Sequence, residues 1–161
     1  MNDRHRQTRG FTLIELVITV AIVGLLTTAA IPLARLASQR SKESDLRTSL
    51  REIRIAIDAY KLAAEQGRVE VKLGDSGYPP TLQTLVDGVE DARSEAKVKI
   101  YFIRRIPRDP FFPDGTVAAA DTWGLRSYAS PPDAPQPGDD VFDVYALTND
   151  KGINGVPYRD W

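Results

Sequence analysis

A chain of 161 residues, 42% hydrophobic and 27% charged, has room for one modest domain with an extension. Its net charge of −1 at pH 7 shows no excess of basic residues, so the sequence predicts no nucleic-acid partner. It has no cysteine, which excludes disulfides and thiolate metal sites. Its single histidine, His5, lies in an N-terminal leader that we expect to be removed, which leaves the mature protein without the commonest nucleophile–base pairs. We therefore expect a protein that is not an enzyme.

The N-terminus combines a polar leader, residues 1–10, with a long apolar run, residues 11–34, in which Glu15 is the only charged side chain. At about 1.5 Å per residue, a helix of this length crosses the roughly 30 Å hydrocarbon core of a bilayer. The leader carries three arginines against one aspartate, so the positive-inside rule keeps it in the cytoplasm. We expect a single-pass membrane segment with the rest of the chain on the opposite side.

The apolar run contains Glu15 and a pattern of small and helix-breaking residues, Gly24, Thr27, Thr28 and Pro32, that are unusual in a membrane segment. The carboxylate of Glu15 costs about 2.5–3.5 kcal/mol in lipid on insertion scales, so it should have a partner or a task. Pro32 removes a backbone hydrogen bond and crowds the carbonyl group of Thr28. Threonine hydroxyls can satisfy the backbone groups freed at such a position. We predict a helix break between Gly24 and Pro32.

Residues Arg9 to Pro32 resemble the class III signal of type IV pilins and type II secretion pseudopilins. The resemblance rests on Gly10-Phe11-Thr12-Leu13-Ile14-Glu15 and the apolar run behind it. It implies that a prepilin peptidase cleaves after Gly10 and methylates the new amine of Phe11. It also implies that Glu15 of one subunit pairs with the Phe11 amine of a neighbour during assembly.

Two simpler interpretations of the N-terminus compete with this one. A secretory signal peptide could end at Thr28-Ala29-Ala30, but the apolar run continues beyond this point, and such a peptide has no use for Glu15. A plain single-pass anchor explains the length and the orientation but leaves Glu15 without a role.

Residues 35–67 are predicted to continue the same helix to about Gln66, with Gly67 as its C-terminal cap. Their apolar residues are spaced alternately four and three apart, which makes one stripe on a helix: Leu46, Leu50, Ile53, Ile57, Tyr60 and Ala64. The charged residues before and beside this stripe are interpreted as a solvated face, with weak ion pairs between subunits as the alternative. They are Arg40, Lys42, Glu43, Asp45 and Arg47.

Residues 68–161 are predicted to form a globular head. Thr81 is the expected N-cap of a short helix through Val86. Residues 97–106 fit a strand or an extended segment, whereas residues 123–129 and 141–147 are the best strand candidates. The predicted fold is α+β: a long N-terminal helix, half transmembrane and half amphipathic, packed on a small antiparallel sheet.

The head resembles that of the major pseudopilin of type II secretion, the G-type subunit. The matching motifs are Tyr78-Pro79, Ile106-Pro107-Arg108-Asp109-Pro110, Asp121-Thr122-Trp123-Gly124 and Phe142-Asp143-Val144-Tyr145. The resemblance implies a type IV pilin-like lollipop, anchored in the inner membrane with a periplasmic head and without a required cofactor. It also implies assembly into a short periplasmic filament that drives protein export across the outer membrane. The implied partners are further copies of the chain, prepilin peptidase, minor pseudopilins, the inner-membrane secretion platform and membrane lipid.

Major pseudopilins of this family often bind calcium in the loop that follows the last predicted strand. Here that loop provides Asn149 and Asp150, with Asp160 further on, whereas Ca²⁺ takes six to eight oxygen ligands. Calcium at these three residues is one interpretation. The other is an Asn/Asp/Gly turn held by hydrogen bonds from side chains to the backbone.

Other functions share the N-terminal features. A type IV pilin for adhesion, motility or DNA uptake is the main alternative, and a minor pseudopilin at a filament tip is a third. A membrane-tethered hydrolase is not indicated, because no spacing of carboxylates in the sequence nominates a catalytic pair.

Overall fold

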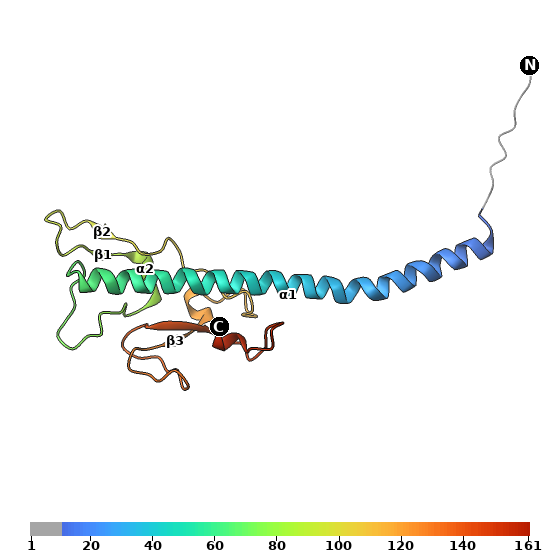
Figure 1. The fold of residues 1–161 in the computed structure, drawn as a ribbon. Coiled ribbons are helices and arrows are strands. Elements are labelled where there is room, and N and C mark those ends of the chain that lie inside the picture. The colour runs from blue at the N-terminus through green and yellow to red at the C-terminus, as the bar shows by residue number, and fades with distance from the viewer. Residues whose placement is uncertain (1–10) are drawn as a thin grey trace, which may run out of the picture. The chain divides into compact units, whose positions relative to one another are not determined.

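The computed structural model of the chain describes residues 11–161 (Figure 1). Its elements are α1 (Leu13–Glu65), α2 (Leu82–Asp87), β1 (Val89–Glu90), β2 (Lys99–Ile100), β3 (Trp123–Arg126) and β4 (Asp143–Ala146). Short 3₁₀ helices, Ala119–Thr122 and Tyr158–Asp160, lie before β3 and near the C-terminus. The chain divides into two compact units, with the boundary between Arg40 and Ser41. The predicted α+β class and the long N-terminal helix are confirmed.

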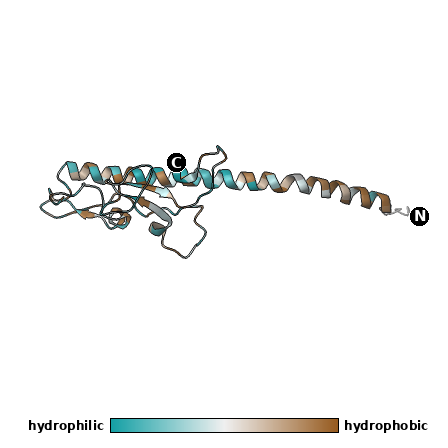
Figure 2. Cartoon of the chain, turned by 90° about the horizontal axis from the view of Figure 1, so that it is seen from below, coloured by the Kyte–Doolittle hydropathy of each residue, from teal (hydrophilic) through white to brown (hydrophobic). Residues whose placement is uncertain are grey.

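In the N-terminal unit, the first half of α1 exposes its apolar side chains on every face. Figure 2 shows this part of the helix mainly in brown, the colour of hydrophobic residues, with paler turns between. Within residues 11–161, α1 is long and apolar enough to cross a membrane, and none of its most apolar 18-residue window is buried. A helix that is apolar all round requires lipid or other helices as its surroundings.

The α1 helix runs through Gly24 and Pro32 as one uninterrupted coil in Figure 1. The Thr28 hydroxyl donates a 2.7 Å hydrogen bond to the carbonyl of Leu25, within the turn that precedes the proline. A Cβ atom added at Gly24 would meet nothing within 4 Å, so the single chain has no steric need for glycine there. The single chain shows no break between Gly24 and Pro32, and the break stays a prediction for packed subunits.

In the C-terminal unit, Ser41–Trp161, the second half of α1 supplies one wall of the core. The predicted stripe is confirmed. Five of its six residues are buried, namely Leu46, Leu50, Ile53, Ile57 and Tyr60, and the sixth, Ala64, is half-buried. The end of the helix is also confirmed at Gly67, which has a φ of 66°. The N–H groups of Gly67 and Arg68 donate to the carbonyls of Ala64 and Ala63, which is a Schellman motif.

The remaining elements of the C-terminal unit surround this half of α1. Figure 1 shows the β1–β2 pair and β3 on opposite sides of the helix. Instead of one sheet there are two antiparallel pairs: Val89 pairs with Ile100, and Trp123 pairs with Ala146. On β4, buried Val144 and Ala146 alternate with half-buried residues, as the predicted period of two requires.

The predicted extended segments are partly confirmed. Only Lys99–Ile100 forms a strand within residues 97–106, because the N–H groups of Phe102 and Ile103 both donate to the carbonyl of Leu85. The short helix is confirmed: the hydroxyl of Thr81 accepts a 3.2 Å hydrogen bond from the N–H of Thr84.

Two of the head motifs found in the sequence lie against each other. The indole N–H of Trp123 donates a 2.8 Å hydrogen bond to the carbonyl of Pro107, and the N–H of Asp109 donates a 3.1 Å bond to the hydroxyl of Thr122. The Asp109 side chain is 1% exposed; its Oδ1 accepts from the N–H of Phe111, and its Oδ2 has no hydrogen-bond partner among the described residues. Burial raises the pKa of Asp109, because the charged form loses its hydration.

Replacing Asp109 by asparagine is therefore expected to make unfolding less dependent on pH. A carboxyl group whose pKa is higher in the folded state contributes most stability below its unfolded pKa of about 3.9, and loses it as pH rises through the folded pKa. The Tm of Asp109→Asn should consequently fall less than that of the wild type from about pH 4 upward. Thermal unfolding of the detergent-solubilised chain measures this difference. The exposed Asp139→Asn is the control and should follow the wild-type pH profile; a pH profile of Asp109→Asn parallel to the wild type would contradict the expectation.

Candidate assembly site

The N-terminus of α1 presents a carboxylate among exposed apolar side chains. Thr12 precedes the helix, and its hydroxyl accepts a 3.4 Å hydrogen bond from the N–H of Glu15. Thr-x-x-Glu is the sequence of a capping box, in which the glutamate side chain bonds back to the N–H of the threonine. Only the threonine half of that pattern is present among the described residues. The Glu15 side chain is thus available to another group.

No side-chain partner of Glu15 lies within residues 11–161. Leu13 and Ile14 beside it are exposed, and so is Phe11, with 81% of its surface accessible. A carboxylate in such apolar surroundings is costly in lipid unless it is paired or neutralised. Gly10, the predicted cleavage position, lies outside the described residues, so cleavage there and methylation of Phe11 stay predictions.

The predicted calcium residues lie in the C-terminal segment, which we define as residues 148–161. The backbone of Asp150 is engaged, its N–H with the hydroxyl of Thr148 at 3.2 Å and its carbonyl with the N–H of Tyr158 at 3.1 Å. The carboxylate of Asp160 lies 4.0 Å from the guanidinium of Arg159. Among residues 11–161, no three His, Cys, Asp or Glu side chains gather into a group that could hold a metal ion.

A sequence profile described as the prokaryotic N-terminal methylation motif matches residues 5–31 of the chain. The type II secretion system core protein G of Klebsiella pneumoniae is 27% identical over 139 residues, 83% of this chain and 91% of that protein. The protein of the same name from Pseudomonas aeruginosa is 26% identical over 76% of this chain and 85% of its own length. Over most of its length the chain is thus similar to the pseudopilins named core protein G, and its N-terminus carries the methylation motif.

A more limited likeness links this chain to the pilins. The type IV major pilin protein PilA of Myxococcus xanthus is 39% identical over 72 residues, 45% of this chain and 32% of the pilin. No solved structure matches the chain. The extent of the core protein G matches means that the likeness includes the head as well as the N-terminal helix.

One residue of this chain was assigned wrongly from the sequence. Glu43 is buried, with 8% of its surface exposed, and does not belong to a solvated face. Its Oε1 accepts a 2.8 Å hydrogen bond from the N–H of Ile153 and a 2.9 Å bond from the hydroxyl of Tyr158. A signal was present, since Glu43 lies three residues before Leu46 and continues the apolar stripe by one position.

Proposed function

We propose that this chain is the major structural subunit of a type II secretion pseudopilus, and that it acts by assembly rather than by catalysis. The observation that carries the proposal is the first half of α1, whose apolar surface is exposed on all sides around one carboxylate. Packed helices of further copies would cover that surface and form the core of a filament. Likeness to core protein G over most of the chain supports secretion as the process served.

Before assembly, the subunit resides in the inner membrane. The first half of α1 spans the bilayer, the leader lies in the cytoplasm and the head lies in the periplasm, as the charge of the leader favours. Prepilin peptidase removes the leader, and minor pseudopilins and the inner-membrane secretion platform are the further partners. No cofactor takes part in this process.

Removal of the leader is tested by replacing Gly10 with valine. Because the peptidase must cut beside a residue without a side chain, Gly10→Val is expected to accumulate as a heavier, uncleaved precursor. The mass of the N-terminal peptide reports cleavage and methylation of Phe11 together. Thr8→Val, which places the same side chain two residues earlier, should be cleaved as the wild type is. Complete processing of Gly10→Val would rule out this cleavage position.

The process served is tested by deleting the gene and measuring export and motility in the same strain. The proposal predicts that exoproteins accumulate in the periplasm while surface pili and twitching motility persist. A type IV pilus role is favoured by the M. xanthus match and predicts the reverse pattern. Loss of pili with normal export would therefore overturn the secretion proposal.

A further inference from the structure

The C-terminal segment forms a compact loop whose polar groups are engaged with its own backbone. The N–H of Gly152 donates to the carbonyl of Val156 at 2.9 Å, and Lys151 forms an antiparallel bridge with Pro157. The side-chain oxygen of Asn154 accepts a 3.1 Å bond from the N–H of Val156, as in a turn stabilised by an asparagine.

These residues do not fit the calcium ion that the family resemblance implies. Calcium requires six to eight oxygen ligands and favours several carboxylates, whereas the loop from Thr148 to Gly155 contains one, that of Asp150. The oxygen of Asn154 is occupied by the turn, and the next residue after Asp150 is a lysine, whose positive charge opposes a dication. The donor set therefore corresponds to the turn and not to a metal site.

The C-terminal segment is bound to α1 by hydrogen bonds to a carboxyl group, that of Glu43, and not by a metal ion. Oε1 of the buried Glu43 accepts from the N–H of Ile153, at the tip of the loop, and from the hydroxyl of Tyr158, where the chain returns. One acceptor thus connects both ends of the loop to the helix. Buried hydrogen bonds to a carboxyl group are stronger than those between neutral groups, and losing the acceptor leaves two donors unsatisfied.

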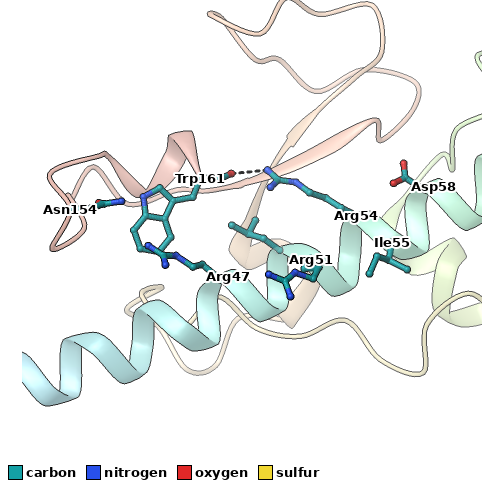
Figure 3. A pocket seen from close by; sticks show the side chains of 8 residues that line it. Arg47, Arg51, Arg54, Ile55, Asp58, Asn154 and Trp161 are labelled. Atoms are coloured by element: carbon teal, nitrogen blue, oxygen red, sulfur yellow. Dashed lines mark hydrogen bonds between the residues drawn. The ribbon is translucent and has the colours of Figure 1, made fainter.

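Aromatic and arginine contacts extend this attachment to Trp161. The ring of Tyr158 stacks on Phe111 at 4.2 Å and meets the Trp161 ring edge-on at 4.9 Å. Figure 3 shows Arg47 of α1 against the Trp161 ring, 4.2 Å from its centre, and Arg54 donating a 2.8 Å bond to the backbone oxygen of Trp161. Arg47, Arg54 and Trp161 also line an open groove of about 420 Å³ beside the helix.

We propose that Glu43 holds the C-terminal segment of this chain on α1 without a divalent cation. The carboxyl group supplies from the helix the fixed oxygen acceptor around which the loop closes. Its burial and its two bonds to groups more than a hundred residues away distinguish it from the exposed glutamates of the same helix. The head consequently folds to the same stability whether calcium is present or chelated.

The test compares the Tm of the full chain in detergent with calcium chloride at about 5 mM and with EGTA. This calcium concentration exceeds the dissociation constants of weak extracellular calcium sites, roughly 10⁻⁴–10⁻³ M. The wild-type Tm is expected to agree within about 1 °C between the two conditions. Glu43→Ala should lower the Tm by roughly 5–10 °C in both. Hydrogen exchange at the Ile153 amide should become at least about tenfold faster in that variant. The exposed Glu52→Ala is the matched control on α1 and should leave both quantities unchanged.

Tyr158→Phe serves as a second variant, which removes one hydroxyl and keeps the ring in place. It should lower the Tm by less than Glu43→Ala and leave the Ile153 amide protected, because that bond to Glu43 persists. If Glu43→Ala does not fold while Glu52→Ala does, the requirement for Glu43 is supported and Tyr158→Phe supplies the calcium comparison. A Tm that rises with calcium in the wild type or in either variant would overturn the proposal. Equal behaviour of Glu43→Ala and Glu52→Ala would overturn it as well.

Discussion

Glu15→Leu is expected to insert into the membrane and to be processed, but to reduce the yield of filaments at least about tenfold. Leucine removes the cost of placing a carboxylate in lipid, so insertion should be as good as in the wild type. In the filament, however, the amine of Phe11 on a neighbouring subunit would be left in an apolar core without its partner. An uncompensated buried charge weakens an association strongly, which is why assembly and not insertion should fail.

The geometry of α1 provides a second explanation for Glu15 that must be separated from pairing. Thr12 and Glu15 have the sequence of a capping box, so the glutamate could serve the end of its own helix. Glutamine fills this position in capping boxes as well as glutamate does, but it has no charge to offer an amine. Glu15→Gln therefore discriminates: pairing predicts a filament yield as low as that of Glu15→Leu, and capping predicts a yield near the wild type.

Filament yield is measured as the fraction of mature subunit in sheared filaments or in a cross-linked ladder. The mass of the N-terminal peptide is determined in the same samples, so that a processing defect is not mistaken for an assembly defect. Thr12→Val removes the observed cap while it keeps the carboxylate, and it should assemble normally. A wild-type yield from Glu15→Leu would refute the pairing role.

The features that could be predicted from the sequence are those that neighbouring residues determine. The stripe from Leu46 to Tyr60 follows from a period that any α-helix imposes, and the Gly67 cap follows from the one residue type that tolerates its φ without strain. The Thr81 cap is equally local, since its hydroxyl bonds three residues on. Sequence spacing is sufficient in each case because the interacting groups lie within one turn.

The features that were missed depend on residues far apart in the chain. Within residues 97–106 apolar and polar residues suit a strand throughout, yet the carbonyl of Leu85 takes the N–H groups of Phe102 and Ile103 and ends the pairing after Ile100. Glu43 is buried because a loop 110 residues later brings donors to it. The sequence of residues 40–47 alone does not reveal which hydrogen-bond donors from the C-terminal segment pack against them.

The proposed assembly site rests on a different kind of signal in the sequence. Glu15 is conspicuous because it is a charge in an apolar run, and the structure leaves it without a side-chain partner among residues 11–161. The proposed partner belongs to another copy of the chain, so one chain cannot contain the completed pair. The same holds for Gly24, whose missing side chain relieves no contact within the described residues. A glycine at position 24 would instead allow a helix of a neighbouring subunit to approach α1 closely.

Ile53→Ala is expected to destabilise the C-terminal unit by about 2–5 kcal/mol, the usual cost of such a truncation in a packed core. The residue is 0% exposed and belongs to the core cluster, to which α1, α2, β3 and β4 contribute buried residues. Truncation to alanine removes its apolar contacts and leaves a cavity that the surrounding core fills only partly. The reduction is a large share of the 5–15 kcal/mol that typically stabilises a domain.

Ile55→Ala is the matched control, because it removes the same atoms from the same helix two residues away. The Ile55 side chain is 60% exposed, so its truncation should change the unfolding free energy by no more than about 0.5 kcal/mol. Both substitutions raise helix propensity equally. The difference between their changes in unfolding free energy therefore measures the effect of burial alone. Unfolding in denaturant, followed by tryptophan fluorescence, reports the C-terminal unit alone, since both tryptophans, Trp123 and Trp161, lie in it. Equal losses in the two variants would mean that α1 is rotated about its axis from the orientation described, and that the stripe beginning at Leu46 does not face the core.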